Sequence, residues 1–494
     1  MNSTPLRGVS TIELLIAFAV LTITLTAVIT VIFGNQSVAI DTGASMAAIA
    51  RAGGALEDER ALTGSDFLAA STTLRTYSVD QTSYQENMSI TDLNPCEKRA
   101  VSALTWDLTS LRPQRATLST LLTDMVEVTK LGGDCAPAGP YADWKTPSRY
   151  SSDSTIGGKP TALDVLGGIA YMGIDAAPFL AIADTRETSE GPSSGLMESF
   201  TSPPPLTAKI NSIDVVRKTE SNGTPRIYGF AAMNAIIGQL TVLDLTERNA
   251  PQVVNTFSLS PCVKNSFPQG WYVYAYDDSL YMVTRETAGP EFHILNVSNP
   301  TSPYEFPIGS ASCKGYELTD TVEQMVVRDQ IIDGIRKRYA YLVTDESDQE
   351  VRVLDVTNPL TISQVAAIDL PGSQDALSVF VMGMHLYVGR QSTPSGPELY
   401  LYQIQFPSPG LSLISTREIG ADVLGIRAGD QKVFLATKKQ GQEVQVIDSS
   451  TPTELKSLSS YNFSNISLQG IEYGPQFIYV IGQGSPNLLM LSSS

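Results

Sequence analysis

Glu13 is the residue of this chain whose position most clearly demands a chemical partner. It is the only charged residue in an apolar stretch that runs from Val9 to Phe33. A stretch of that length is long enough to cross a bilayer as a helix, where an unpaired carboxylate is costly. A protonated amine at the start of a neighbouring helix is a suitable partner, because leaving either charge alone in hydrocarbon costs several kcal/mol. We therefore interpret Glu13 as a residue that fixes the register of packed helices.

The residues in front of this stretch resemble the class III signal of type IV prepilins and pseudopilins. A short polar leader with one basic residue, Arg7, ends at Gly8. The resemblance implies that a prepilin peptidase cuts between Gly8 and Val9, that Val9 is then N-methylated, and that Glu13 acts in filament assembly. The family more often has Phe or Met where this chain has Val9. A secretory signal peptide is disfavoured, because its cleavage site would follow the apolar core and not precede it.

The cysteines and histidines do not form a recognisable metal site. They are Cys96, Cys135, Cys262, Cys313, His293 and His385. No two cysteines form a CxxC pair and the histidines are far apart, so we expect neither a metal nor a cofactor. The exported location that the resemblance implies favours disulfides. Sequence order suggests Cys96–Cys135 and Cys262–Cys313, although four cysteines allow three connectivities.

Paired carboxylates are the remaining candidates for catalysis. Asp277-Asp278 and Asp345-Glu346 are such pairs, and two carboxylates on one face can act as general acid and base. Both pairs are interpreted more simply as hairpin turns. His293 and His385 have no nearby nucleophile motif, and GxSxG is absent. We expect no catalytic residue and no enzyme.

Composition narrows the class of protein further. A chain of 494 residues exceeds one ordinary core, so we expect at least two domains. A hydrophobic content of 42% with 17% charged residues is typical of globular proteins. The net charge of −18 gives little support for nucleic-acid binding, which needs clustered bases. The one basic cluster, residues 336–338, is short and is interpreted as a solvated strand edge.

The N-terminal part is expected to be one long helix followed by a smaller helical region. Residues 1–8 are the leader, and we predict a pilin-like helix over 9–62 with a transmembrane part over 9–33. The glycines at 53 and 54 are a point where this helix is expected to bend or end. Small and apolar residues recur at helical spacing in its second half, at Val38, Ala39, Met46 and Ile49.

Residues 63–145 are predicted to form a connecting region with a second helix over 115–131. Gly132-Gly133 would end that helix. The region lacks the clear run of strands expected of a pilin head. The apolar face of the second helix is formed by Leu118, Leu121, Leu122, Met125, Val126 and Val128.

From residue 146 onward the sequence contains an internal repeat. The unit is a strand ending in an acid or amide, a turn with proline, and another strand, as in VRVLDVTNPLTISQV (351–365). A period near 50 residues with short strands predicts a β-propeller, and the repeats resemble the LVIVD family. The acid or amide is expected to cap its turn by accepting bonds from backbone N–H groups. These residues are Asp184, Asp244, Asn296, Asp355 and Asp448, with Gln405 in a weaker copy.

The first strands of the repeats predict seven blades over residues 146–494. The last blade has only three strands before the chain ends, so we expect residues 146–160 to supply its fourth strand and close the ring. The predicted blade starts lie near Leu163, Ser212, Gly270, Thr321, Asp375, Asp422 and Leu468.

Three polar inserts between the predicted strands are the expected binding surface. They span Thr185–Leu206, Lys218–Pro225 and Gln391–Pro397 and are rich in Ser, Gly and Pro. Loops on the faces of a rigid scaffold are where binding specificity normally lies. Nothing in these inserts identifies the surface ligand or protein partner.

The sequence therefore predicts a mainly β protein with an N-terminal pilin-like transmembrane helix, a small helical region and a seven-bladed propeller. We interpret it as a minor or tip subunit of a type IV pilus-type filament that displays the propeller for adhesion or partner binding. The expected partners are the prepilin peptidase, the membrane and the N-terminal helices of other pilin-like subunits. We expect a single-pass precursor in the cytoplasmic membrane with its globular part outside, and an extracellular filament after assembly.

Two alternatives remain open at this point. One is a pseudopilin-like component of a type II secretion or competence machine, in which the propeller handles cargo. The other is a membrane-anchored propeller that binds its target without entering a filament.

Overall fold

The computed structural model describes most of the chain between residues 11 and 493. The described ranges are 11–65, 70–79, 82–94, 97–107, 113–123, 144–153, 157–185, 206–220, 224–259, 268–285, 289–307, 309–310, 313–332, 335–394, 396–405, 410–429, 431–463, 466–474, 477–484 and 486–493. The chain divides into two compact units, Met1–Met125 and Val126–Ser494, which are described in turn.

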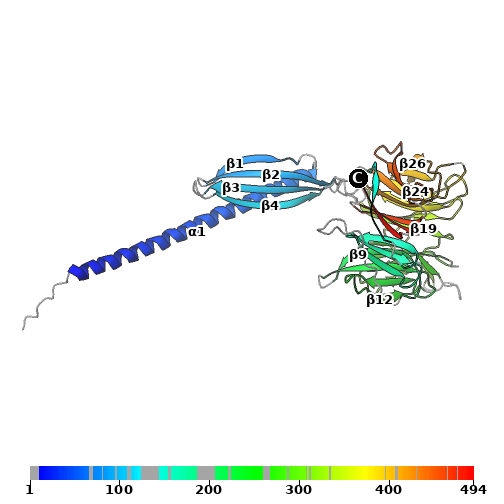
Figure 1. Cartoon of the computed structure of the whole chain (residues 1–494), viewed down its shortest axis with the longest axis horizontal. Helices are drawn as coiled ribbons and strands as arrows, with labels where there is room; N and C mark the ends of the chain where they lie inside the picture. The colour runs from blue at the N-terminus through cyan, green and yellow to red at the C-terminus, as the bar shows by residue number, and fades with distance from the viewer. Residues whose placement is uncertain are drawn as a thin grey trace, which may run out of the picture. The chain divides into compact units, whose positions relative to one another are not determined.

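The first unit is a long helix packed on an antiparallel sheet (Figure 1). Helix α1 spans Thr11–Ser65 and continues through both glycines at 53 and 54, where a bend or an end was expected. The sheet has four strands in sequential order. They are β1 (Thr73–Val79), β2 (Thr82–Asn94), β3 (Glu97–Asp107) and β4 (Pro113–Thr123).

Small residues of α1 form the face that packs on this sheet. Ala48, Ala52 and Leu56 are buried at a spacing of four residues, which places them on one side of a helix. The predicted face is wrong at its two describable members, because Met46 is 68% exposed and Ile49 is 51% exposed. Alanine side chains let the helix backbone approach the pleated surface closely, so the bulkier residues turn outward.

The predicted transmembrane part over residues 9–33 is corrected by the structure. No helix of the described residues combines the length and the hydropathy that a membrane span requires. The side chains described in this part run from Phe18 to Val31. They include polar threonines whose hydroxyls bond carbonyls one turn earlier, such as Thr24 to the carbonyl of Val20 at 2.8 Å.

The predicted helical connecting region is also wrong, since its described residues form the sheet. Strand β4 replaces the first part of the helix predicted over 115–131, and it pairs with β3 along its whole length. Its burial alternates from residue to residue, so Leu121 is exposed and Leu122 is buried. Threonine-rich alternation favours a strand over a helix. Residues 124–131 of the predicted helix lie outside the described ranges.

The second unit is built from antiparallel sheets of three or four strands. The first three sheets are β6 (Pro160–Leu166), β7 (Ile169–Ile174) and β8 (Leu180–Asp184); β9 (Ile210–Thr219), β10 (Pro225–Met233), β11 (Leu240–Asp244) and β12 (Gln252–Phe257); and β13 (Gln269–Tyr276), β14 (Ser279–Arg285), β15 (Phe292–Asn296) and β16 (Tyr304–Glu305). A short ribbon, β17 (Gly309–Ser310) and β18 (Cys313–Lys314), follows them.

Four further sheets complete the series. They are β19 (Val322–Ile332), β20 (Ile335–Thr344), β21 (Val351–Asp355) and β22 (Ser363–Ile368); β23 (Ala376–Met382), β24 (His385–Arg390), β25 (Leu399–Gln405) and β26 (Gly410–Arg417); β27 (Val423–Gly429), β28 (Lys432–Thr437), β29 (Val444–Asp448) and β30 (Lys456–Tyr461); and β31 (Ser467–Tyr473), β32 (Phe477–Gln483), β33 (Leu488–Ser493) and β5 (Pro147–Asp153).

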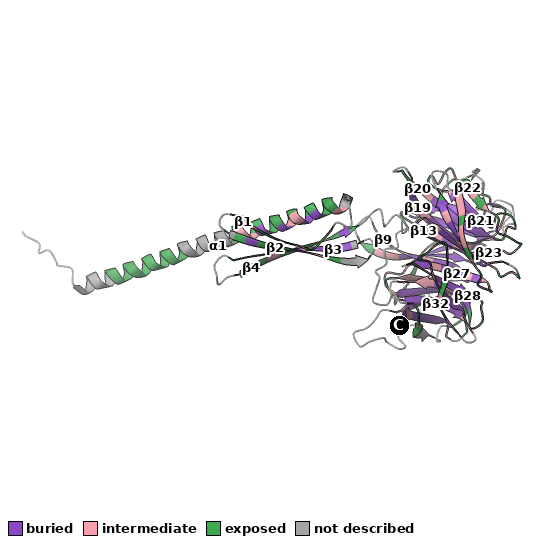
Figure 2. Ribbon diagram, turned by 90° about the horizontal axis from the view of Figure 1, so that it is seen from above, coloured by how far each residue is buried: buried purple, intermediate pink, exposed green. Residues whose placement is uncertain are grey.

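The seven first strands contact one another in a closed cycle, which makes the unit a β-propeller. Each of β6, β9, β13, β19, β23, β27 and β31 touches the next, and β31 touches β6. These strands lie where the sequence predicts the seven blade starts. Buried residues concentrate on the blades (Figure 2), as expected when sheets stack face to face.

Strand β5 closes the ring, as the sequence predicts. It pairs with β33, for example Ser152 with Leu489, so the last blade contains strands from both ends of the unit. Trp144, just before β5, packs edge-on against Phe434 with ring centroids 5.2 Å apart. The hydroxyl of Ser459 also donates to the carbonyl of Trp144.

Among the described contacts, four of the six predicted capping side chains cap their turns, whereas Asp184 pairs with Arg248 and Gln405 donates to the hydroxyl of Ser412 at 3.0 Å. The amide of the residue two positions later donates to the side chain of Asp244 at 3.0 Å, of Asn296 at 3.1 Å, of Asp355 at 3.0 Å and of Asp448 at 2.9 Å. This local bond competes with strand continuation and ends the third strand of the blade.

A second repeated interaction links successive blades and has no counterpart in the sequence predictions. A buried Glu or Gln just before the third strand accepts backbone N–H bonds from the segment that enters the next blade. Glu398 accepts from Ile419 at 2.7 Å and from Gly420 at 2.9 Å. The same position is occupied by Gln239, Glu291, Glu350 and Glu443, with partners at Leu259, Leu318, Leu370 and Phe463.

We predict that removing β5 destabilises the propeller. A fragment beginning at Val126 retains the closing strand, whereas a fragment beginning at residue 157 leaves the edge of β33 unpaired. The shorter fragment should melt at a lower temperature and aggregate as its concentration rises, because an open edge pairs with other chains. Calorimetry and light scattering on the two fragments provide the measurement. Equal melting temperatures and equal solubility would show that the ring does not need this pair.

The blade-linking bond is tested at Glu443, whose two oxygens accept from Gly441 and Phe463, each at 2.9 Å. Glu443→Ala should lower the free energy of unfolding by about 2 kcal/mol, since a buried donor without an acceptor costs about 1–3 kcal/mol. Glu443→Gln keeps one acceptor oxygen and should lose clearly less. Denaturant titration of both variants measures the difference, and an equal loss would argue against the bonds as the cause.

Candidate functional site

The inner strands of the propeller surround a cavity of about 360 Å³ that is partly open to solvent. All seven inner strands contribute to its lining. Each of them pairs with its neighbouring strand through a register shift near its start, for example between Pro160 and Ala162 in β6 and between Val423 and Gly425 in β27. Such bulges re-aim side chains, and here they precede the polar residues that face the cavity.

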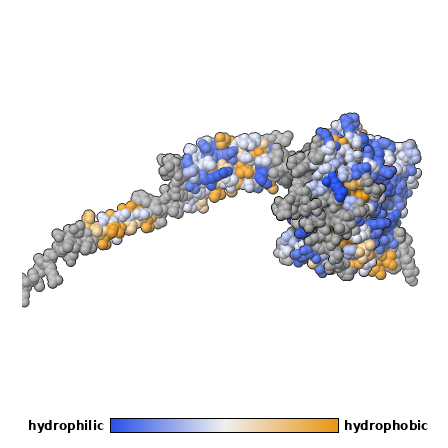
Figure 3. Space-filling view, viewed as in Figure 1, coloured by the Kyte–Doolittle hydropathy of each residue, from blue (hydrophilic) through white to orange (hydrophobic). Residues whose placement is uncertain are grey.

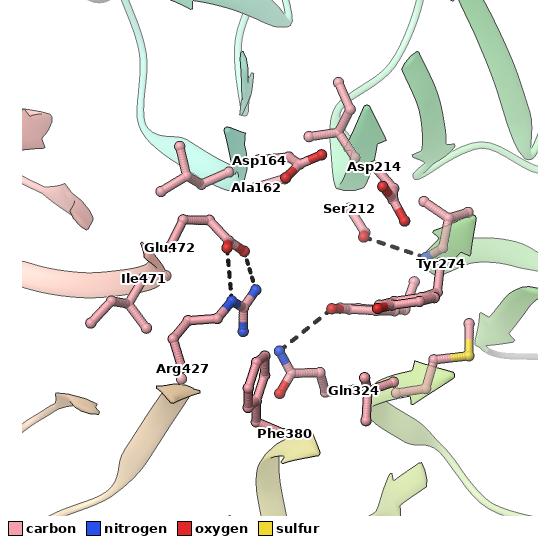
Figure 4. A pocket seen from close by; sticks show the side chains of 18 of the residues that line it. Ala162, Asp164, Ser212, Asp214, Tyr274, Gln324, Phe380, Arg427, Ile471 and Glu472 are labelled. Carbon is pink, nitrogen blue, oxygen red and sulfur yellow. Dashed lines mark hydrogen bonds and ion pairs between the residues drawn. The ribbon is translucent and has the colours of Figure 1, made fainter. Parts of the chain in front are cut away.

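Charged side chains from separate blades extend toward this cavity (Figure 4). Arg427 of β27 and Glu472 of β31 form a two-pronged ion pair, with Nε of the arginine 2.8 Å from Oε2 of the carboxylate. Burial lowers the pKa of Arg427, but the adjacent Glu472 carboxylate more than offsets this and the pKa is raised overall. Arg427 also lies over the ring of Phe380, 5.6 Å from its centroid.

Arg328 of β19 lies near the ring of Phe380 as well. Its Nη1 donates to the hydroxyl of Tyr274 and, at 2.9 Å, to the carbonyl of Val327. The guanidinium carbon is 5.8 Å from the centroid of Phe380. Within the described part of the chain Arg328 has no carboxylate at ion-pair distance.

Asp164 of β6 and Asp214 of β9 join neighbouring blades. Asp164 accepts from the amides of Val165 at 2.7 Å and Val215 at 2.5 Å, and Asp214 accepts from the amide of Ala275 at 2.6 Å. Each carboxyl group thus satisfies a backbone donor of the next inner strand. This structural role exists whether or not a ligand binds.

Burial changes the ionisation of both carboxyl groups. It raises the pKa of Asp164 well above its usual range, and the neighbouring Asp214 and Glu472 raise it further. Burial also raises the pKa of Asp214 to about 7, with Glu472 adding to the effect while the Ala275 amide, Arg328 and Arg427 oppose it. Burial therefore favours the protonated forms of Asp164 and Asp214, which lie in the same lining as the guanidinium groups of Arg328 and Arg427.

This arrangement is suited to binding a polar molecule. Protonated carboxyl groups both donate and accept hydrogen bonds, arginines donate, and aromatic rings supply apolar faces. Among the described residues no three His, Cys, Asp or Glu side chains are placed to share a metal ion.

The two histidines lie outside the cavity lining. His293 is buried, with Nδ1 2.7 Å from Oε1 of Glu305 and Nε2 2.9 Å from the carbonyl of Pro290. His385 begins β24 and burial lowers its pKa. Both histidines therefore belong to the blades and not to the cavity lining.

The two predicted carboxylate pairs occupy turns away from the cavity lining. Asp277 lies in the turn between β13 and β14 with a φ of 53° and forms ion pairs with Arg336 and Arg338. These arginines also pair with Asp329, so two members of the predicted basic cluster are neutralised by carboxylates.

The second pair, Asp345-Glu346, follows β20. Asp345 accepts from the amide of Thr321 at 2.9 Å. Glu346 lies 3.2 Å from Arg352, and a hydrogen bond shared with the Asp320 carboxyl group raises the pKa of Glu346 to about 7.

Several predicted site residues lie outside what the structure describes. The positions of Gly8, Val9, Cys96, Cys135 and Cys262 are not among the described residues, and neither is the insert 186–205. Glu13 lies in α1 and Cys313 in β18, but the description of these two does not extend to their side chains. The predicted cleavage, methylation and disulfides therefore stay predictions.

The cavity residues themselves were missed by the sequence interpretation. A signal for them exists, because aligning the blades at the bulge places a charged residue within an otherwise apolar inner strand. It is visible as ALDVL (162–166), SIDVV (212–216) and GIEY (470–473). Only the ring brings these separate positions to one place.

Comparison with known proteins adds little. No family model matches the chain, and no curated protein matches it. Among solved structures, a putative 6-phosphogluconolactonase from Bacteroides fragilis has a TM-score of 0.44 and 14% identity over 61% of this chain and 85% of that one. The periplasmic gluconolactonase of Pseudomonas aeruginosa has a TM-score of 0.43 and 13% identity over 68% and 89%.

A computationally designed protein, Ika8, gives a similar result, with a TM-score of 0.43 and 9% identity over 70% of this chain and 99% of that one. At these scores the similarities assign no activity or substrate. The expectation that the chain is not an enzyme stays a prediction.

We predict that Asp214 makes the propeller less stable as the pH rises toward 7. The folded state keeps the proton of Asp214 up to about pH 7, whereas the unfolded chain releases it near pH 4. Between these values the folded state binds more protons, so the free energy of unfolding falls with pH, by at most about 1.4 kcal/mol per pH unit. Asp214→Asn cannot ionise and should reduce this slope.

Denaturant titrations from pH 4 to 8 measure the slope, and Asp278→Asn in an exposed turn serves as the control. The pKa of Asp164 is raised as well, so the free energy of unfolding of the Asp214→Asn variant should still fall with pH, but less steeply. Identical slopes for the variant, the control and the unchanged protein would contradict the raised pKa of Asp214.

Proposed function

We propose that this chain is a pilin-like subunit, in a minor or tip position, of a type IV pilus-type filament and that it displays the propeller for adhesion or partner binding. The observation that supports this is the uncovered apolar surface on the first half of α1. Residues 18–31 expose large apolar side chains, including Phe18 at 66%, Ile23 at 69% and Val31 at 62% (Figure 3).

Such a surface calls for a partner. Soluble monomers rarely expose a contiguous apolar patch of this kind, and those that do use it for association. The same segment of neighbouring copies, or of related subunits, supplies an equally apolar helix. Packing such helices side by side removes the patch from water without a new recognition element.

The second half of α1 supports the same proposal. It packs on the sheet β1–β4 through Ala48, Ala52 and Leu56, whereas the described side chains of residues 18–31 are mostly exposed. The resemblance of the N-terminal sequence to prepilins implies this division. The sheet supplies the strands that a pilin head requires.

The propeller is then the displayed part. The unit that contains it spans Val126–Ser494 and is much larger than the unit that carries α1. A head of that size is difficult to repeat at every step of a tightly packed filament, which favours a minor or tip position. We place the assembled subunit outside the cell, with the prepilin peptidase acting on its leader beforehand.

The proposal is tested by incorporation into filaments. Glu13→Ala should leave the amount of chain in the cell unchanged but reduce its amount in sheared, purified filaments by about tenfold, because the carboxylate no longer pairs with a neighbour's amine. Glu57→Ala, at an exposed glutamate of the same helix, is the matched control.

Mass spectrometry of the filament-bound chain should give an N-terminus at Val9. An intact Met1 would contradict the prepilin processing. Absence of the unchanged protein from purified filaments would favour a secretion or competence pseudopilus, or a propeller that never enters a filament. Equal incorporation of both variants would make Glu13 dispensable for assembly.

A further inference from the structure

One cation of the propeller cavity, Arg328, has no carboxylate at ion-pair distance among the described residues. Arg427 is matched by Glu472, but Arg328 forms its hydrogen bonds with a tyrosine hydroxyl and a backbone carbonyl. Asp164 and Asp214 are the other acids of the lining, and burial favours their protonated forms. A guanidinium in these surroundings attracts an anionic group.

Two polar atoms on the cavity lining lack partners within the described part of the protein. They are Nε of Arg328 and Oδ1 of Asn211, both shielded from solvent. The other end of the Asn211 amide donates to the carbonyl of Gly270 at 2.7 Å, which fixes the side chain. Buried polar groups without a partner are rare, because each costs about 1–3 kcal/mol. A bound molecule that bears both an acceptor and a donor could supply the partners of these two atoms.

The remaining lining favours a ring with hydroxyl groups. Carboxyl oxygens of Asp164 and Asp214 and the amide of Gln324 offer hydrogen bonds from several directions, while Tyr272 and Tyr473 add aromatic surface. Sugars present hydroxyls at their edge and C–H groups on their faces, and this combination suits both kinds of contact. A cavity of about 360 Å³ lies near the lower limit for ligand pockets, which fits one sugar ring.

We propose that the central cavity binds a monosaccharide-sized sugar acid, with its carboxylate on Arg328 and its hydroxyls on Asp164, Asp214 and Asn211. A neutral sugar would leave the arginine unmatched, and a small inorganic anion would leave the acids and the amide unused. The inference extends the proposed display role by giving the propeller a ligand class. It depends on the cavity alone, so a binding measurement distinguishes its failure from failure of the filament proposal.

The experiment is calorimetric titration of the purified full chain at pH 6 with D-galacturonate and D-glucuronate, against D-galactose, D-glucose and inorganic phosphate. We expect one uronate to bind at least about tenfold more tightly than its neutral counterpart and than phosphate. Arg328→Met should weaken that binding by about tenfold or more, the size of a lost charge-assisted hydrogen bond, and Arg328→Lys by less.

Arg248→Met is the matched control, since it removes an arginine that pairs with Asp184 outside the cavity lining and should leave binding unchanged. Thermal unfolding establishes that each variant is folded, and Asn211→Ala provides a second test that does not alter charge. The proposal is overturned if neither uronate binds, if neutral sugar or phosphate binds as tightly, or if folded Arg328→Met and Asn211→Ala bind like the unchanged protein.

Discussion

Closure of the ring by β5 and β33 is the interaction on which the rest of the propeller depends. Each blade packs only on its two neighbours, so an open series would expose one apolar sheet face and one strand edge at each end. Pairing the first strand of the unit with the last removes both. It also fixes the distances between inner strands, and therefore the volume of the cavity that they surround.

Side chains also supply hydrogen-bond acceptors for backbone amides that face the centre of the ring. Inner strands have one edge without a neighbouring strand, so their amides need other partners. Asp164, Asp214 and Gln324 accept from the next inner strand, and buried residues such as Glu398 accept from the crossing segments. The same carboxyl groups that join blades thus supply the polar lining of the cavity.

The first unit follows a different rule, in which side-chain size decides what a helix contacts. Ala48 and Ala52 allow α1 to approach its sheet, whereas large apolar residues such as Ile23 and Val31 stay exposed. A pattern of apolar spacing alone does not separate these two cases, which is why Met46 and Ile49 were assigned to the wrong face. Part of the segment predicted as a helix forms strand β4 of this sheet. Pairing with β3 outweighs the helical preference that the apolar pattern around Leu118 and Leu122 suggests.

The propeller could be predicted from the sequence alone, because its signals are interactions between residues close together in the chain. Turn caps such as Asp355, the repeat period and the missing fourth strand are local or additive signals, so seven blades and their closure follow without coordinates. The cavity was decided by tertiary structure, because Asp164, Arg328 and Glu472 are far apart in the chain and each resembles an ordinary strand residue. Ring geometry converts them into neighbours, and burial then raises the pKa of Asp164. Packing likewise decided which face of α1 contacts the sheet and why residues 113–123 form a strand. Pairing with a neighbouring strand outweighs the intrinsic preference of a segment for helix or strand.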